Sequence, residues 1–348
     1  MSYFGSTLMK KIYLISLLLL TFQGQAQKAY IIKAIETKNQ SSFRSLSIPN
    51  DSIAWLGGTN GTIGRSSDGG NTWIFTQVKG YEKCDFRSLY AFDDKKAVIA
   101  NAGSPAYILF TEDGGAHWKL VYENKDSAAF IDGIDYRSDW EGTVCGDPIN
   151  GRMLMLGTLH AYASWFDLPR QNRPILEKGE ASFAASGTTL RYMKDGSIMI
   201  ATGGKVSRLL RSDAKTRKWN SINTPILQGS NSTGIFSFAF SDDKQGVIVG
   251  GDYKNETLGK DHVFYTVDGG KTWLKPAMPT GGYRECVEYI DEKTLISCGP
   301  NGADISYNKG NTWRAIPDAK GFHVVRKSRN GKLVILAGKD GKIAMLSR

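Results

Sequence analysis

Short apolar runs that alternate with small polar residues recur along the chain, and turns rich in Gly, Asp and Asn separate them. Examples are "FRSLSI" from Phe43, "AVIANAG" from Ala97 and "GVIVGG" from Gly246. Short runs rich in β-branched and aromatic residues are typical of strands that pack into a sheet. The chain shows no series of alternating helices. The pattern therefore predicts an all-β protein built from short antiparallel strands.

One octet recurs between these strands, first as "SSDGGNTW" at residues 66–73 and then as "TEDGGAHW", "TVDGGKTW" and "SYNKGNTW". Weaker copies are "TLHAYASW" and "RSDAKTRKW". Each copy ends on a tryptophan, and the six lie 45, 47, 54, 54 and 40 residues apart: Trp73, Trp118, Trp165, Trp219, Trp273 and Trp313. Repeats of about this length that hold four short strands are typical of propeller blades around a central channel.

The last repeat, which begins near "GFHVVRKS", holds only three strands before the chain ends. The segment "AYIIKAIETK", residues 29–38, is the expected fourth strand of that repeat. Pairing the two ends of the chain would close the ring and remove the exposed sheet edges. The sequence thus predicts a seven-bladed β-propeller of four-stranded antiparallel blades, closed by an N-terminal strand.

The octet itself has the chemistry of a tight turn. Its Asp accepts hydrogen bonds from nearby backbone N–H groups, Gly tolerates positive φ, and Trp supplies a large apolar anchor. The last copy has Asn308 in place of Asp, which keeps the turn but removes the carboxylate that catalysis or calcium binding would need. We therefore predict a structural role for Asp68, Trp73, Asp113, Trp118, Asp268, Trp273, Asn308 and Trp313.

The N-terminus has the features of a secretion signal. Lys10 and Lys11 precede an apolar run from Ile12 to Phe22, and small residues near Ala26 suit a signal peptidase. The run is too short to span a membrane as a helix. We expect residues 1–26 to be removed and residues 27–348 to form one domain that is soluble in the periplasm or outside the cell, as a monomer. The chain carries a net charge of +10, of which the signal contributes two, and this charge favours acidic partners.

Four cysteines in an exported chain allow two disulfides. Cys286 and Cys298 flank a short turn, so they are expected to face each other across a hairpin, with Cys84 and Cys145 as the other candidates. Free buried thiols are the alternative. No cluster of metal ligands and no cofactor motif emerges from the sequence.

The octets resemble the Asp-box, or bacterial neuraminidase repeat, and residues 41–348 resemble the photosystem II stability and assembly factor family of seven-bladed propellers. Asp-boxes occur on propellers of unrelated chemistry, so the motif indicates fold more than function. The family resemblance implies a non-enzymatic protein outside the cytoplasm that binds another protein during assembly. It also implies a binding surface lined with arginines.

We match that surface to the residues that open the first strand of each repeat, which converge around the channel in a radial fold. Arg44, Arg87 and Arg284 each follow an aromatic residue at this position, and three arginines at one mouth would bind a protein carboxylate or another acidic ligand. The alternative is that each arginine pairs with a local acid such as Asp85 or Glu285. The complete set of predicted binding residues is Arg44, Arg87, Asp132, Asp147, Arg284 and His323.

The second functional hypothesis is a carbohydrate-active enzyme, a glycoside hydrolase similar to sialidases. "SFRSLSIP" resembles the segment that supplies an arginine to their substrate carboxylate, and Tyr283, Arg284 and Glu285 would extend the site. On a strand, however, Tyr283 and Glu285 lie on one side and Arg284 on the other. Dinucleotide binding lacks its glycine fingerprint, and nucleic-acid binding does not fit the expected location of the protein, despite its basic charge. Binding without catalysis is the prediction, and enzymatic activity remains open.

Overall fold

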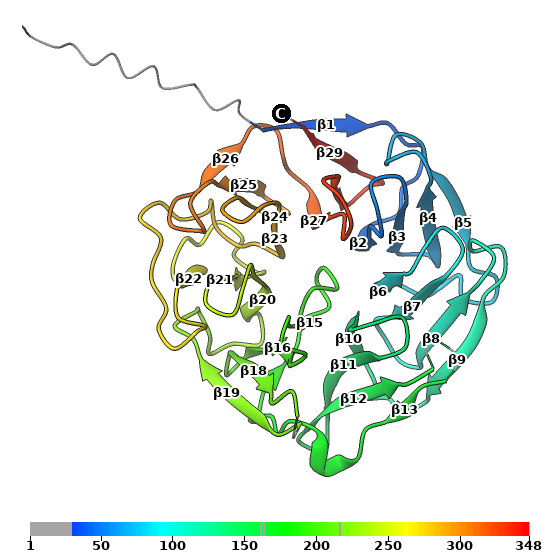
Figure 1. Ribbon diagram of the computed structural model, residues 1–348, viewed down its shortest axis with the longest axis horizontal. Coiled ribbons are helices and arrows are strands. Elements are labelled where there is room, and N and C mark those ends of the chain that lie inside the picture. The colour runs from blue at the N-terminus through cyan, green and yellow to red at the C-terminus, as the bar shows by residue number, and fades with distance from the viewer. Residues whose placement is uncertain (1–29, 161, 163, 216, 348) are drawn as a thin grey trace, which may run out of the picture.

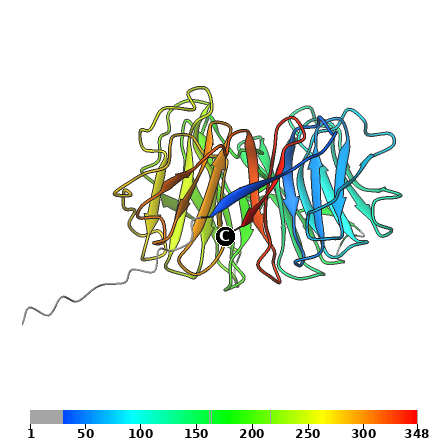
Figure 2. The same cartoon turned by 90° about the horizontal axis from the view of Figure 1, so that it is seen from above.

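The structure is a computed structural model that describes residues 30–160, 162, 164–215 and 217–347. Seven small antiparallel sheets stand around a central axis like the blades of a propeller (Figure 1). In the side view their strands run roughly along that axis (Figure 2). The signal segment predicted for residues 1–26 lies outside the described residues. The predicted all-β seven-bladed propeller is confirmed.

The first three blades follow the sequence order from the channel outward. Blade 1 holds β2 (Phe43–Ser47), β3 (Ala54–Gly58), β4 (Thr62–Ser66) and β5 (Ile74–Gln77). Blade 2 holds β6 (Phe86–Ala91), β7 (Ala97–Asn101), β8 (Ala106–Thr111) and β9 (Lys119–Asn124). Blade 3 holds β10 (Ile131–Tyr136), β11 (Gly142–Ile149), β12 (Arg152–Thr158) and β13 (Phe166–Asp167), followed by the short 3₁₀-helix η1 (Arg170–Asn172).

Blades 4 and 5 depart from this order. Blade 4 holds β15 (Leu190–Tyr192), β16 (Ile198–Ala201), β18 (Arg208–Ser212) and β19 (Trp219–Asn223). Blade 5 holds β20 (Thr233–Phe240), β21 (Gly246–Asp252) and β22 (Val263–Thr266), and two short strands, β14 (Glu180–Ala181) and β17 (Gly203–Gly204), extend its inner edge. Its outermost position is reduced to a single bridge between Tyr265 and Leu274. This five-stranded sheet differs from the predicted four strands because β14, which precedes β15, and β17, which lies between β16 and β18, both join the neighbouring blade.

The last two blades are regular, and the second of them contains both ends of the described chain. Blade 6 holds β23 (Cys286–Tyr289), β24 (Leu295–Gly299), β25 (Gly302–Ser306) and β26 (Arg314–Ile316). Blade 7 holds β27 (Phe322–Lys327), β28 (Val334–Gly338), β29 (Ile343–Ser347) and, outermost, β1 (Ile31–Ile35). β1 pairs antiparallel with β29, and Ile31 lies opposite Ser347.

The core lies between neighbouring blades. The second strands, such as β3 and β7, are buried along their whole length because blades pack against both of their faces. Outer strands such as β9 are half-exposed. The second strands therefore read as continuous apolar runs, which explains why they stand out in the sequence.

The Asp-box turns have the geometry that the sequence predicts. Asp68 Oδ1 accepts a hydrogen bond from the Thr72 N–H at 2.9 Å, and its Oδ2 accepts one from Thr72 Oγ1 at 2.7 Å. These bonds lower the pKa of Asp68 to about 2. In the fourth turn Asn308 Oδ1 accepts the Thr312 N–H at 2.8 Å in the same way. Each acceptor is used within its own turn, which fits a structural role.

Two further sequence expectations concern cysteines and membranes. Cys286 and Cys298 lie directly opposite each other on β23 and β24, as expected for a hairpin. All four cysteines are free thiols in this structure, so a disulfide between the two stays a prediction. Across the described residues, no helix is long and apolar enough to cross a bilayer.

Candidate functional site

One residue at the start of the first strand bulges out of the β-ladder in five of the blades. The ladder skips one residue between Phe43 and Ser45, and the same irregularity recurs at equivalent places in blades 2, 3, 5 and 7. A bulge turns the extra side chain away from the regular alternation. The bulged residues are Arg44, Arg87, Asp132, Phe236 and His323.

In blade 6 the same position belongs to Glu285 rather than to the predicted Arg284. Gly299 approaches the Tyr283 carbonyl there as Gly58 approaches the Ser42 carbonyl in blade 1. Glu285, and not Arg284, is therefore equivalent to Arg44, one residue later than the sequence analysis predicts. Since a one-residue slip exchanges the two faces of a strand, Glu285 takes the channel position.

Glu285 is the centre of an ion-pair network at the channel mouth. Its carboxylate lies 3.2 Å from Arg44 Nη1, 2.6 Å from His323 Nδ1 and 3.2 Å from the Tyr283 hydroxyl. Burial acts to raise the pKa of Glu285, but the charge of Arg44 and the hydrogen bond with His323 outweigh it and lower the pKa. Side chains from blades 1, 6 and 7 thus meet here and neutralise one another.

The placement predicted for Arg284 at the channel mouth is wrong. Its Nε donates to Asp304 Oδ2 at 2.7 Å and its Nη1 donates to the Tyr283 carbonyl at 2.8 Å. Both side chains of the Arg284–Asp304 pair are 3% exposed. Arg284 therefore points into its own blade as a buried structural cation, and the predicted rim of three arginines does not form.

The two remaining arginines are covered by the protein's own chain. The segment of residues 182–188, which precedes β15, reaches into the centre of the ring (Figure 1). Arg44 Nη1 donates to the Ala185 carbonyl at 3.0 Å, and Arg87 Nε pairs with Asp85 at 2.7 Å. The Arg44 and Arg87 side chains remain 21% and 32% exposed. This agrees with the alternative of local ion pairs, while a binding role for Arg44, Arg87 and His323 stays a prediction.

Asp132, which is buried, and Asp147, which is half-buried, form a carboxyl pair in blade 3. Asp132 is 1% exposed, and one oxygen of each carboxyl has no hydrogen-bond partner among the described residues. Burial and the neighbouring charge of Asp147 raise the pKa of Asp132 well above its ordinary value. Burial also raises the pKa of Asp147 to about 6. Contact of either carboxyl with a ligand stays a prediction.

The sialidase-like arrangement brings Tyr283 and Glu285 together but leaves them inaccessible. Tyr283 is 1% exposed, and burial raises the pKa of its hydroxyl well above the ordinary range. A tyrosine nucleophile needs substrate contact and a lowered pKa. Because Tyr283 has neither, this site does not have the properties of a glycosidase centre.

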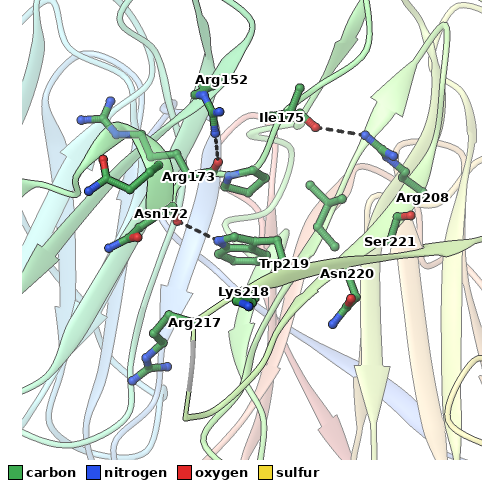
Figure 3. A pocket seen from close by; sticks show the side chains of 13 residues that line it. Arg152, Asn172, Arg173, Ile175, Arg208, Arg217, Lys218, Trp219, Asn220 and Ser221 are labelled. Atoms are coloured by element: carbon green, nitrogen blue, oxygen red, sulfur yellow. Dashed lines mark hydrogen bonds between the residues drawn. The ribbon is translucent and has the colours of Figure 1, made fainter.

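A concave surface lies between blades 3 and 4, at residues that the sequence analysis does not name as binding candidates. It has a volume of about 610 Å³ and is bordered by β12, the segment around η1, β18 and β19. Trp219 lies at its centre, with its Nε1 donating to the Asn172 carbonyl at 2.8 Å (Figure 3). Five cationic side chains and no carboxylate are among the described residues that line it: Arg152, Arg173, Arg208, Arg217 and Lys218.

Internal contacts hold the basic groove open. Arg208 binds Glu180 at 2.9 Å, Arg217 binds Glu141 at 2.7 Å and Arg173 binds Asp167 at 3.1 Å, so these three cations are partly neutralised. Arg152 Nη1 donates to the Arg173 carbonyl at 2.8 Å (Figure 3). No carboxylate contact to Arg152 is recorded among the described residues. The groove therefore presents positive charge on a preformed wall.

An apolar groove continues from the basic one toward the Asp-box face. The two share Asn172, Arg217 and Trp219, and Leu159 and Phe166 line the apolar part. Phe166 is 44% exposed and Ile175, at the basic end, is 63% exposed. Positive charge beside exposed apolar side chains suits an extended peptide that carries both acidic and apolar residues.

Comparison with known proteins agrees with this architecture. The family model described as "Photosynthesis system II assembly factor YCF48" matches residues 25–165. The photosystem II assembly lipoprotein Ycf48 of Synechococcus sp. (strain CC9902) is 23% identical over 273 residues, covering 69% of this chain and 77% of that protein. Both matches make the chain similar to the photosystem II assembly factor-like propellers.

Two solved YCF48 structures share the fold of this chain. One is YCF48 bound to a D1 peptide, with a TM-score of 0.69 and 16% identity, covering 93% of this chain and 99% of that one. The other is YCF48 from Cyanidioschyzon merolae, with a TM-score of 0.66 and 16% identity, covering 90% of this chain and 98% of that one. At this identity the likeness concerns the fold alone.

Two features of the sequence indicated the groove between blades 3 and 4. The octet at residues 158–165 lacks the Asp and both Gly residues, which indicates an irregular blade. The next segment, "LPRQNRP", places two arginines between prolines at residues 168–174. Prolines restrict such a segment to an extended or turn conformation outside the sheet. A search for departures from the repeat would have found this surface.

Proposed function

We propose that this protein is a non-enzymatic binding scaffold that holds an extended, acidic segment of a partner protein in the groove between blades 3 and 4. The observation that carries the proposal is the continuity of five cationic side chains with an apolar groove around Trp219. Guanidinium groups bind carboxylates in a bidentate manner, and exposed apolar side chains supply burial. The name of the Synechococcus relative, an assembly lipoprotein, and the D1 peptide bound by one solved YCF48 support a role in protein assembly.

The proposal includes the setting of the scaffold. Residues 1–26 act as an export signal, residues 27–348 form a single propeller domain, and the protein works as a monomer outside the cytoplasm. The net charge of +10, or +8 once residues 1–26 with Lys10 and Lys11 are removed, supports acidic partners, since long-range attraction raises their rate of association. The partner is defined by chemistry only, as a protein segment that combines carboxylates with apolar side chains.

The direct test uses a short fluorescent peptide in which Glu alternates with Leu, together with a second peptide in which Gln replaces Glu. Fluorescence anisotropy at low salt should show binding of the acidic peptide and much weaker binding of the neutral one. The double variant Arg152→Glu, Lys218→Glu should weaken binding of the acidic peptide by about tenfold or more, because two attractive charges become repulsive.

The matched control reverses two exposed cations on blade 6 and the neighbouring turn, in the double variant Arg314→Glu, Lys271→Glu. It changes the net charge equally and should bind the acidic peptide nearly as well as the wild type. Equal weakening in both double variants would contradict a localised groove, since only overall charge would then matter. Turnover of a fluorogenic sialoside by the wild type would contradict the non-enzymatic scaffold.

A further inference from the structure

A second cavity lies on the propeller axis, at the opposite end of the channel from the Glu285 network. It has a volume of about 360 Å³ and is lined by the last residues of the first strands of six blades. The Asp-box turns lie on the same face of the propeller as this cavity. In blade 1, for example, the Gly69 N–H of the Asp-box donates to the Ser52 carbonyl, which lies in the turn at the end of β2. We call this space the axial cavity.

Positive charge exceeds negative charge in the axial cavity. Four cations and two carboxylates are among its described lining residues: Arg191, Arg326, Lys327, Arg329, Asp135 and Glu288. The excess of two positive charges lies near the propeller axis, where the first strands of the blades converge. An excess of two positive charges in a partly enclosed space is unfavourable unless an anion is close, since the low local polarity strengthens repulsion.

One carboxylate is shared between two guanidinium groups. Glu288 Oε2 lies 2.9 Å from Arg191 Nη2 and 3.4 Å from Arg326 Nε. The remaining carboxylate, Asp135, accepts the Tyr192 N–H at 2.8 Å. The acids therefore neutralise only part of the cationic charge. Arg191 Nε is buried and has no hydrogen-bond partner among the described residues.

The third guanidinium, Arg329, is held in place without a carboxylate. It lies 4.2 Å from the ring centroid of Tyr90, and its nitrogens donate to Ser47 Oγ at 3.0 Å and to the Ala91 carbonyl. Burial lowers the pKa of Arg329, and the nearby charge of Arg326 lowers it further. These contacts fix the position of a cation that repels its neighbour, an arrangement that a bound anion would relieve.

We propose that the axial cavity binds a small dianion with oxygen ligands, held by Arg191, Arg326 and Arg329. Two compounds share this chemistry, inorganic phosphate and a short dicarboxylate such as succinate. Planar guanidinium forks match the paired oxygens of both, and two negative charges balance the excess of two positive ones. The cavity volume is sufficient for either anion. This site is separate from the groove between blades 3 and 4.

The experiment titrates the full chain, after export processing, with sodium phosphate or sodium succinate by isothermal calorimetry. Sodium chloride keeps the ionic strength constant, so that general screening does not imitate binding. Saturable binding of at least one dianion is expected, and the better ligand distinguishes a phosphate site from a carboxylate site. Absence of saturable heat with both anions would overturn the proposal.

Variants locate the binding. Arg326→Gln and Arg329→Gln should each weaken the binding constant by about tenfold or more, because each removes a charge and a fork of donors. Arg329→Lys keeps the charge but loses the paired donors of the guanidinium. Its affinity for the dianion should lie between that of Arg329→Gln and that of the wild type. Arg314→Gln, an exposed arginine on β26, is the control and should bind like the wild type. Circular dichroism verifies folding of each variant, and unchanged affinity in both folded Gln variants would contradict the site.

Discussion

Replacing Arg284 should lower the stability of the propeller more than replacing any exposed arginine. Four donor nitrogen contacts hold this side chain, two to Asp304, one to the Tyr283 carbonyl and one to Asn301 Oδ1. The side chains of Arg284 and Asp304 are each 3% exposed. Arg284→Ala therefore leaves the Asp304 carboxylate buried without its counter-ion.

The expected cost follows from that unpaired charge. Removing one partner of a buried ion pair typically costs about 3–5 kcal/mol, because the other charge loses its compensation. Domains of this kind have a free energy of unfolding of roughly 5–15 kcal/mol, so the loss is a large share of the total. The double variant Arg284→Met, Asp304→Leu removes both charges and should recover most of the stability, since apolar residues of similar volume often replace buried pairs at little cost.

Urea denaturation followed by tryptophan fluorescence measures these differences at fixed ionic strength. The control Arg314→Ala should change the free energy of unfolding by no more than about 0.5 kcal/mol, as surface substitutions usually do. A loss below about 1 kcal/mol in Arg284→Ala would refute the reasoning. So would a double variant as unstable as the single one, because the buried charge would then not be the cause.

Three further changes test other parts of the fold. Asp68→Ala should lower the free energy of unfolding by about 1 kcal/mol, as loss of a side-chain cap does. Asp68→Asn should keep most of the wild-type stability, and urea denaturation measures both variants. Burial raises the pKa of Asp147 to about 6 from 3.8. The folded state therefore binds this proton more tightly, and stability falls as pH rises from about 4 to about 6. Thermal melts at several pH values should show a smaller loss of stability between about pH 4 and pH 6 in Asp147→Asn than in the wild type. An unchanged pH dependence in the variant would contradict the raised pKa of Asp147. Deleting residues 27–40 removes β1 and should increase hydrogen exchange in β29, so unaltered protection there would contradict its pairing role.

The blade count was predictable because it depends on local chemistry that repeats. Each Asp-box uses a carboxylate or amide, two turn positions and a Trp within eight residues, so a single copy is sufficient to identify it. The expected fourth strand of the last blade follows from counting strands, and β1 occupies that place. Local turn chemistry and a constant period therefore determine the architecture.

The channel mouth was not predictable to the residue. The pairs Phe43-Arg44 and Tyr283-Arg284 look alike in sequence. In blade 1, however, Arg44 occupies the bulged position, whereas in blade 6 Glu285 occupies the equivalent position. A bulge adds one residue, and the sequence pattern does not state on which residue it falls. The segment of residues 182–188 was also missed, since its place in the channel depends on contacts with strands far away in the chain.

The groove between blades 3 and 4, where we propose that a partner binds, arises from departures from the repeat. A regular outer strand such as β9 has six residues and covers the side of its blade. In blade 3 the octet has decayed, and β13 has only two residues. The segment around η1 takes the place of a full strand, and Trp219 and its basic neighbours face the space that remains. Because a complete fourth strand would fill that space, the loss of regularity and the presence of a binding groove have one structural cause.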